Sequence, residues 1–277
     1  MQHGNAQMKI YCEIERILVW FSCGATSAVA AKLAIKKYGR SHPVDIVYTD
    51  TGSEHPDNER FLKDCEEWFG RPVKVIKNPQ YKNIWDVFRK TRYLVGPTGA
   101  RCTAELKKKM RHQYQQIWSD LQVFGFHVGE RQRAARFIEN NPEAMLWTPL
   151  IDEGLGHDDC VAMIKEAGIE VPAMYLLGYQ NNNCIGCVKG YKGYWAKIRQ
   201  DFPEYFSRMI EIEAELGNTV LREDGGAPLR LKDLPSDIKP LDDNPEISCG
   251  VLCETVLEDI EIQEQPSGPV IRQRADE

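Results

Sequence analysis

The stretch that decides the fold is ILVWFSCGATS, residues 17–27. Its first five residues form a short apolar run with β-branched and aromatic side chains, which is typical of a buried parallel strand. Residues 28–37 are rich in Ala, Leu and Lys at helical spacing. The small residues between these segments therefore form a turn from a strand into a helix.

The alternation of strand and helix patterns continues outward from this unit. Further strands are predicted at 44–48, 73–76 and 123–128, and helices at 58–69, 158–167 and 194–215, the last interrupted near Pro203. Such alternation predicts an α/β fold, with a twisted, mainly parallel sheet and helices on both faces. We expect an α/β domain over residues 1–216. The glycine- and proline-interrupted residues 217–277 are expected to form an irregular, cysteine-containing C-terminal extension.

Composition and charge exclude several classes of protein. The chain has 277 residues, of which 42% are hydrophobic and 27% charged, as in an ordinary globular protein. It contains no apolar run of membrane-spanning length and no signal-peptide pattern, so we expect a cytoplasmic protein without membrane contact. A net charge of −6 argues against broad binding of duplex DNA. A local basic face remains open, with candidate residues Lys107, Lys108, Lys109, Arg111, Arg131, Arg133 and Arg136.

The strand-to-helix turn is a candidate phosphate site. Backbone N–H groups converge at such a turn, and the helix N-terminus adds positive potential. Gly24 allows close approach of an anion, and hydroxyls are offered by Ser22, Thr26 and Ser27. On this short motif alone, a turn of small residues that binds nothing is an equal alternative.

The loop resembles the pyrophosphate loop of the adenine-nucleotide α-hydrolase superfamily, Ser-Gly-Gly-x-Asp-Ser. It is closer to the Ser-x-Gly-Ala variant of sulfonucleotide reductases, which Ala25 matches. Cys23 stands at the first glycine, and Thr26 stands where the superfamily has an aspartate. Asp50-Thr51-Gly52, Gly129 to Arg133 and Thr148-Pro149-Leu150 are similar to further motifs of the phosphoadenosine-phosphosulfate (PAPS) reductase family, in the same order.

The resemblance extends from about residue 18 to 206 and implies a site for ATP, adenylyl sulfate (APS) or PAPS. Arginines are implied at the anionic end of the nucleotide, although Arg131 and Arg133 could also be surface charges. The residues expected to bind the nucleotide are Ser22, Gly24, Ala25, Thr26, Ser27, Asp50, Thr51 and Lys107.

Nine cysteines are many for a cytosolic chain, and a C-x2-C pair stands out among them. Two thiolates at the spacing of Cys184 and Cys187 can hold a metal or a cluster edge, or act as a redox pair. With Cys102, 82 residues before Cys184, the pair resembles the cluster cysteines of iron–sulfur adenylyl-sulfate reductases, which implies a [4Fe-4S] cluster. The segment from Cys102 to Lys107 also resembles that of DNA-phosphorothioation ATP pyrophosphatases.

Cys249 and Cys253 leave three arrangements open. Cys249-Gly250 resembles the Glu-Cys-Gly-Leu-His tail of sulfonucleotide reductases, whose cysteine attacks the substrate sulfur. Alternatively, Cys249 or Cys253 completes a cluster with Cys102, Cys184 and Cys187. In the third arrangement, Cys184, Cys187, Cys249 and Cys253 hold a structural zinc ion.

Three functions follow from these resemblances. The first, which we slightly prefer, is reduction of a sulfonucleotide, with Cys249 as nucleophile and a thioredoxin-like protein as reductant. The second is an ATP pyrophosphatase that activates an acceptor for sulfur insertion into nucleic acid. The third is a non-catalytic nucleotide sensor or partner-binding protein, which is supported by Thr26 at the aspartate position.

Overall fold

A computed structural model describes residues 13–96, 99–241 and 270–272. The predictions for Cys249 and Cys253 lie outside these residues, as does most of the predicted extension beyond residue 241.

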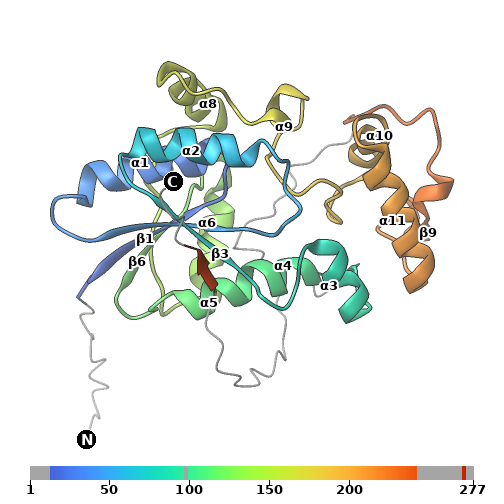
Figure 1. The fold of residues 1–277 in the computed structure, drawn as a ribbon, viewed down its shortest axis with the longest axis horizontal. Coiled ribbons are helices and arrows are strands. Elements are labelled where there is room, and N and C mark those ends of the chain that lie inside the picture. The colour runs from blue at the N-terminus through green and yellow to red at the C-terminus, as the bar shows by residue number, and fades with distance from the viewer. Residues whose placement is uncertain (1–12, 97–98, 242–269, 273–277) are drawn as a thin grey trace, which may run out of the picture.

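The centre of the molecule is a mainly parallel sheet (Figure 1). Its first strand in chain order is the one predicted from the apolar run at residues 17–21. The sheet has the order β10-β3-β2-β1-β6-β7. Neighbouring pairs among the last five strands are parallel, whereas β10 pairs antiparallel with β3. Their bounds are β1 Arg16–Phe21, β2 Val44–Thr49, β3 Val73–Lys77, β6 Asp120–Val123, β7 Met145–Trp147 and β10 Val270–Arg272. The prediction of a mainly parallel α/β sheet is confirmed.

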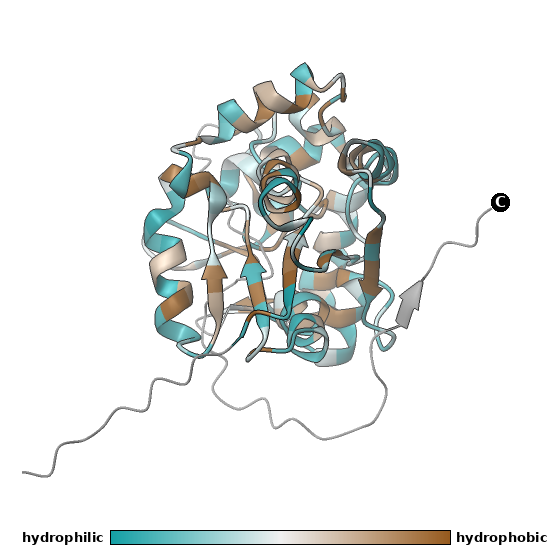
Figure 2. Cartoon of the chain, turned by 90° about the vertical axis from the view of Figure 1, so that its left-hand side faces the viewer, coloured by the Kyte–Doolittle hydropathy of each residue, from teal (hydrophilic) through white to brown (hydrophobic). Residues whose placement is uncertain are grey.

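Helices cover both faces of this sheet because successive residues of a strand point to opposite sides. Ile17, Val19 and Phe21 pack in one core with the first group of helices, whereas Leu18 and Trp20 pack in another core with the second. Figure 2 shows the strands enclosed between these helices. The first group is α1 Ala25–Tyr38, α2 Asn58–Phe69 and α8 His157–Glu166, and the second is α5 Lys109–Tyr114 and α6 Arg131–Asn140.

A third core lies beside the sheet and contains the cysteines of interest. Trp195 is fully buried there, in one hydrophobic cluster with Cys102, Cys184 and Cys187. The elements around this cluster are α3 Ile84–Thr91, α4 Arg101–Thr103, the π-helix η1 Ala104–Lys108, α10 Lys192–Asp201, α11 Pro203–Leu216, β8 Leu221–Arg222, β9 Pro228–Leu229 and the 3₁₀ turn η3 Leu231–Asp233. The remaining short elements are β4 Val95–Gly96, β5 Gly99–Ala100, the 3₁₀ turn η2 Val128–Glu130, α7 Pro149–Asp152 and α9 Ala173–Leu176.

The predicted elements differ from the observed ones mainly at one strand. The strand predicted at 123–128 is wrong in its bounds, because β6 ends at Val123. Phe124 and Phe126 continue the apolar pattern as buried loop residues that pack against α6. By contrast, the helix predicted at 58–69 has the bounds of α2, and Pro203 begins α11 where the break was expected. No helix in the described ranges is long and apolar enough to cross a membrane.

The residues after α11 are held to it by one buried carboxylate. Glu213, only 1% exposed, accepts hydrogen bonds from the backbone N–H of Val220 (2.9 Å) and Leu231 (2.8 Å) and from the Thr219 hydroxyl (2.9 Å). Leaving a buried donor without an acceptor costs the full desolvation free energy of that donor. These bonds therefore hold the β8–β9 hairpin against α11.

We therefore expect Glu213→Ala to lower the free energy of unfolding by about 3 kcal/mol, since it leaves the backbone N–H groups of Val220 and Leu231 without their acceptor. Urea denaturation measures the change. The control is Glu211→Ala, an exposed change on the same helix, with an expected effect within about 0.5 kcal/mol. Equal effects of the two substitutions would contradict this account of the hairpin.

Candidate functional site

The turn from β1 to α1 is closed by the side chain of its last serine. Ser27 is buried, and its hydroxyl accepts the Ser22 N–H at 3.0 Å and donates to the Gly24 carbonyl at 2.9 Å. Ser22 is exposed and Thr26 half-buried, so their hydroxyls remain accessible to a ligand. Of the hydroxyls predicted to bind phosphate, that of Ser27 thus serves to shape the loop.

A tyrosine that the sequence did not suggest reaches the first turn of α1. The Ala25 N–H donates to the Tyr175 hydroxyl at 3.3 Å, and a Cβ placed on Gly24 would lie 3.1 Å from the same oxygen. Burial raises the pKa of Tyr175 to about 12, so the phenol stays neutral. Tyr175 lies on α9, about 150 residues along the chain, and no local sequence signal connects it to the loop.

Gly125 was also missed. A Cβ on this residue would stand 2.7 Å from the Ser27 nitrogen and 2.8 Å from the Thr26 carbonyl carbon. The backbone after β6 thus contacts the start of α1 so closely that only glycine fits. A glycine between two buried phenylalanines at a strand end was the available signal.

Cys23 occupies the bend of the loop with a left-handed backbone, φ 57°. Burial raises the pKa of its thiol well above the usual value, and the charges of Glu54 and Asp50 act in the same direction, opposed by Lys107. The thiol is therefore neutral near pH 7 and adds no negative charge where a phosphate would bind. These effects also place Asp50 and Lys107, two predicted nucleotide-binding residues, within electrostatic range of the loop.

The asparagine-rich segment before the C-x2-C pair contacts this loop directly. The buried Asn182 amide donates to the Cys23 carbonyl at 2.7 Å and to the Asn58 side-chain oxygen at 2.8 Å. Asn58 begins α2, which follows the loop after β2. The Asn182 amide thus joins three segments: the turn between β1 and α1, the loop between β2 and α2, and the segment that carries the cysteine pair.

The cysteine pair itself is fixed against the end of β2. Cys184 Sγ lies 3.1 Å from the Thr51 hydroxyl and 3.8 Å from Glu54 Oε1. The Ile185 N–H donates to the Ser53 carbonyl at 2.9 Å. The contact between Thr51 and Cys184 places a predicted nucleotide-binding residue next to a predicted metal-binding cysteine.

Tyr194 shapes the bend between the two cysteines. Its hydroxyl accepts the N–H groups of Gly186 (3.1 Å) and Cys187 (2.9 Å) and donates to the Cys184 carbonyl (3.2 Å). Gly186, with φ 79°, makes the turn and packs against Trp85 and Trp195. The bend that carries the two thiols is therefore held by three hydrogen bonds to one buried hydroxyl.

Cys102 lies on α4 in the same hydrophobic cluster as Cys184 and Cys187, and each of the three is at most 9% exposed. Within residues 13–96, 99–241 and 270–272, no three His, Cys, Asp or Glu side chains converge as metal ligands. The cluster or zinc site thus stays a prediction, whose fourth ligand falls outside the described residues.

Three polar atoms near the loops have no hydrogen-bond partner in the described part of the chain, although they are buried. They are the Thr49 hydroxyl oxygen, Asn58 Nδ2 and Asn182 Oδ1. Thr49 ends β2, and the other two belong to the amide contact described above. Because buried polar groups are normally paired, they suggest a polar ligand at this edge of the sheet.

The predicted arginines lie at the start of α6, after η2. Arg131 is exposed, whereas Arg133 is held by an ion pair with Glu130 and lies 5.2 Å over the Phe126 ring. Arg133 is thereby oriented, and Arg131 remains in solvent.

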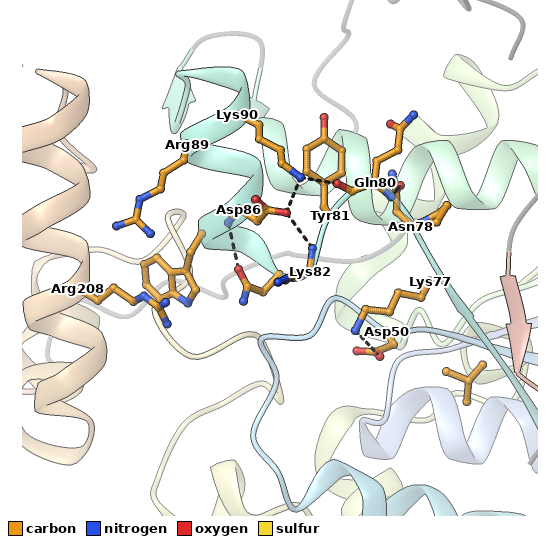
Figure 3. A pocket seen from close by; sticks show the side chains of 14 residues that line it. Asp50, Lys77, Asn78, Gln80, Tyr81, Lys82, Asp86, Arg89, Lys90 and Arg208 are labelled. Carbon is orange, nitrogen blue, oxygen red and sulfur yellow. Dashed lines mark hydrogen bonds and ion pairs between the residues drawn. The ribbon is translucent and has the colours of Figure 1, made fainter. Parts of the chain in front are cut away.

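A basic groove opens beside Asp50. Its volume is about 830 Å³, and its lining includes side chains from β3, α3 and α11 (Figure 3). Asp50 itself pairs with Lys77 at 3.1 Å and accepts the Gly52 N–H at 2.7 Å. The groove was not predicted. Most of its lining comes from residues 77–90, but Asp50 and Arg208 join that stretch only in the fold.

Comparison with known proteins shows which family and which solved structures this chain is similar to. The model of the phosphoadenosine phosphosulfate reductase domain matches residues 16–190. A phosphate complex of phosphoadenylyl-sulfate reductase from Candida auris has 12% identity and a TM-score of 0.42, covering 60% of this chain and 81% of that one. The U34-tRNA thiolase NcsA from Methanococcus maripaludis, with its [4Fe-4S] cluster, has 14% identity and a TM-score of 0.43, covering 84% of each chain. No curated protein matches.

The contact at Gly125 makes a testable prediction. Gly125→Ala should displace the start of α1 and lower the free energy of unfolding by about 1–3 kcal/mol, because its Cβ meets backbone atoms that have no room to move. Gly225→Ala is the control, since a Cβ there meets nothing within 4 Å. Thermal denaturation of both variants measures the difference. A Gly125→Ala protein as stable as the control would show that the close approach is not real.

Proposed function

The chain belongs to the phosphoadenosine phosphosulfate reductase family, and on that basis we propose that it binds an adenine nucleotide for cysteine-dependent sulfur chemistry. The phosphates bind at the turn between β1 and α1, and the base lies toward the ends of β1 and β2. This placement follows the general rule that ligands of open α/β sheets bind at the carboxyl ends of the strands.

The observation that carries the proposal is the attachment of the cysteine segment to the phosphate loop. Asn182 donates to the Cys23 carbonyl at 2.7 Å, and two residues later Cys184 Sγ lies 3.1 Å from the Thr51 hydroxyl. A nucleotide on the loop and a sulfur-bearing group are thus brought to one edge of the sheet.

The reaction we propose first is reduction of a sulfonucleotide. The Cys249 thiolate attacks the sulfur of the sulfate group, a cysteine S-sulfonate forms, and the adenosine phosphate leaves. A dithiol protein of the thioredoxin class then attacks Cys249 Sγ, which releases sulfite, and its second thiol resolves the mixed disulfide. Lys107, Arg131 and Arg133 stabilise the anionic end of the nucleotide.

A [4Fe-4S] cluster is the metal centre that this proposal favours, with zinc as the alternative. Cys102, Cys184 and Cys187 supply thiolates from one hydrophobic cluster, and Cys253 or Cys249 adds the fourth. The donor chemistry suits either centre, whereas the described side chains do not converge on one point. A bound cluster would supply a polarisable, redox-active group next to the nucleotide.

A second candidate function is supported by the basic groove. An ATP pyrophosphatase that activates an acceptor for sulfur insertion needs space for that acceptor beside the nucleotide. The groove shares Asp50 with the predicted nucleotide site and provides such a space. A sensor without catalysis is the third candidate, and it would bind nucleotide without turnover.

Binding at the phosphate loop is tested by Gly24→Val. The added side chain meets Tyr175 Oη and blocks the approach of a phosphate, so we expect a loss of affinity of at least about tenfold for ATP, APS and PAPS alike. Isothermal titration calorimetry measures binding, and far-ultraviolet circular dichroism checks folding. Unchanged affinity in a folded variant would place the nucleotide elsewhere.

The roles of the cysteines are separated by two serine variants prepared without oxygen. Cys184→Ser should lose bound iron or zinc, because a ligand thiolate is removed.

Cys249→Ser should keep the metal and the nucleotide but release no sulfite if Cys249 is the nucleophile. Metal analysis and mass spectrometry of a Cys249 S-sulfonate are the measurements. A wild-type protein that carries neither iron nor zinc would contradict the metal centre, and conversion of ATP to AMP and pyrophosphate would favour the second candidate.

A further inference from the structure

The groove beside Asp50 is positively charged in a protein that is acidic as a whole. The formal net charge of the chain is −6, yet five cationic and only two anionic side chains line this groove. The cations are Lys77, Lys82, Arg89, Lys90 and Arg208. A concentration of one sign against the sign of the whole chain indicates a site for the opposite charge.

Both carboxylates of the groove are already neutralised within it. Asp50 pairs with Lys77 at 3.1 Å, and Asp86 pairs with Lys90 at 2.9 Å. Asp86 also accepts the Lys82 backbone N–H at 3.1 Å. An anionic ligand would therefore meet two paired carboxylates and not free ones.

Two cations remain without an ion pair in the part of the chain that the structure describes, namely Lys82 and Arg208. The Arg208 guanidinium lies 5.3 Å over the ring of the buried Trp85, which orients it without neutralising it. Arg89 pairs with Glu215, at 3.0 Å, and both groups are solvent-accessible. An oriented arginine and an unpaired lysine are the groups that bind phosphate.

The cations are spread along the groove. In Figure 3, Arg208 reaches in from α11 on one side, whereas Lys77 lies with Asp50 on the other, and Lys82 lies between them. A single phosphate could contact one end only. The arrangement fits a ligand with several phosphates in succession, and the end at Asp50 brings that ligand to the nucleotide site.

We propose that this groove binds the sugar–phosphate backbone of a single-stranded polynucleotide, which is the acceptor in the second candidate function and rests on that function. Cationic grooves that follow a backbone are the usual means of binding single strands. The acidic remainder of the chain disfavours the broad contact that a duplex needs. The substrate class of the site is then a nucleic acid strand.

The experiment measures fluorescence anisotropy of a labelled single-stranded oligonucleotide, as DNA and as RNA, with the full chain. The variants are Lys82→Glu and Arg208→Glu, with Lys82→Gln and Arg208→Gln as milder changes. The control is Lys165→Glu, an exposed charge reversal on α8, away from the groove. We expect each groove reversal to weaken binding about tenfold and the control to have no effect. The slope of log Kd against log salt should fall by about 0.7 for each cation removed.

Equal affinity of the groove variants and the control would overturn the proposal. Full competition by free AMP or pyrophosphate at concentrations matched in phosphate would overturn it too, since the occupant would then be a small anion. Calorimetry with adenine nucleotides on the same variants distinguishes a failure of the groove proposal from a failure of the proposed function. Unchanged nucleotide binding with lost oligonucleotide binding supports the groove, whereas wild-type protein that binds oligonucleotide but no nucleotide would contradict the proposed function alone.

Discussion

The buried amide of Asn182 joins three parts of the chain that are distant in sequence. It donates to the Cys23 carbonyl, 159 residues away, and to Asn58 at the start of α2. A buried backbone carbonyl that loses its donor costs about 1–3 kcal/mol, so the contact constrains both loops. The position of the phosphate loop relative to the cysteines depends on this constraint, and so does the proposal that a nucleotide and a sulfur group meet at one edge.

The parallel sheet makes that meeting possible. The carboxyl ends of β1 and β2 lie side by side, so the turn at Ser22–Ser27 and the loop containing Thr51 and Glu54 become neighbours. Gly125, after β6, allows the third strand end to contact the start of α1. The cysteine loop is attached to this edge by the Ile185 N–H, which donates to the Ser53 carbonyl, and to α10 by the Tyr194 hydroxyl. The basic groove continues the same edge toward α11.

Much of the fold was predictable because its signals are local. The apolar run before Ser22, the helix at 58–69 and the break at Pro203 each depend on a few adjacent residues. The strand at 123–128 was misplaced because Phe124 and Phe126 are buried in a loop, which periodicity cannot distinguish from a strand. In the candidate site, the motifs indicated which segments matter. The contacts of Tyr175 and Asn182 were not predictable, because each joins a hydroxyl or amide to a backbone group that is distant in sequence.

Hydrogen–deuterium exchange with and without a saturating adenine nucleotide tests the central claim most directly, because it reports on both loops at once. If the phosphate loop and the cysteine segment form one site through Asn182, nucleotide binding slows amide exchange in residues 22–28 and also in 182–190. In Asn182→Ala, protection of the second segment should be lost while the first retains part of it. Protection confined to residues 22–28 in the wild-type protein, with 182–190 unchanged, would contradict the account.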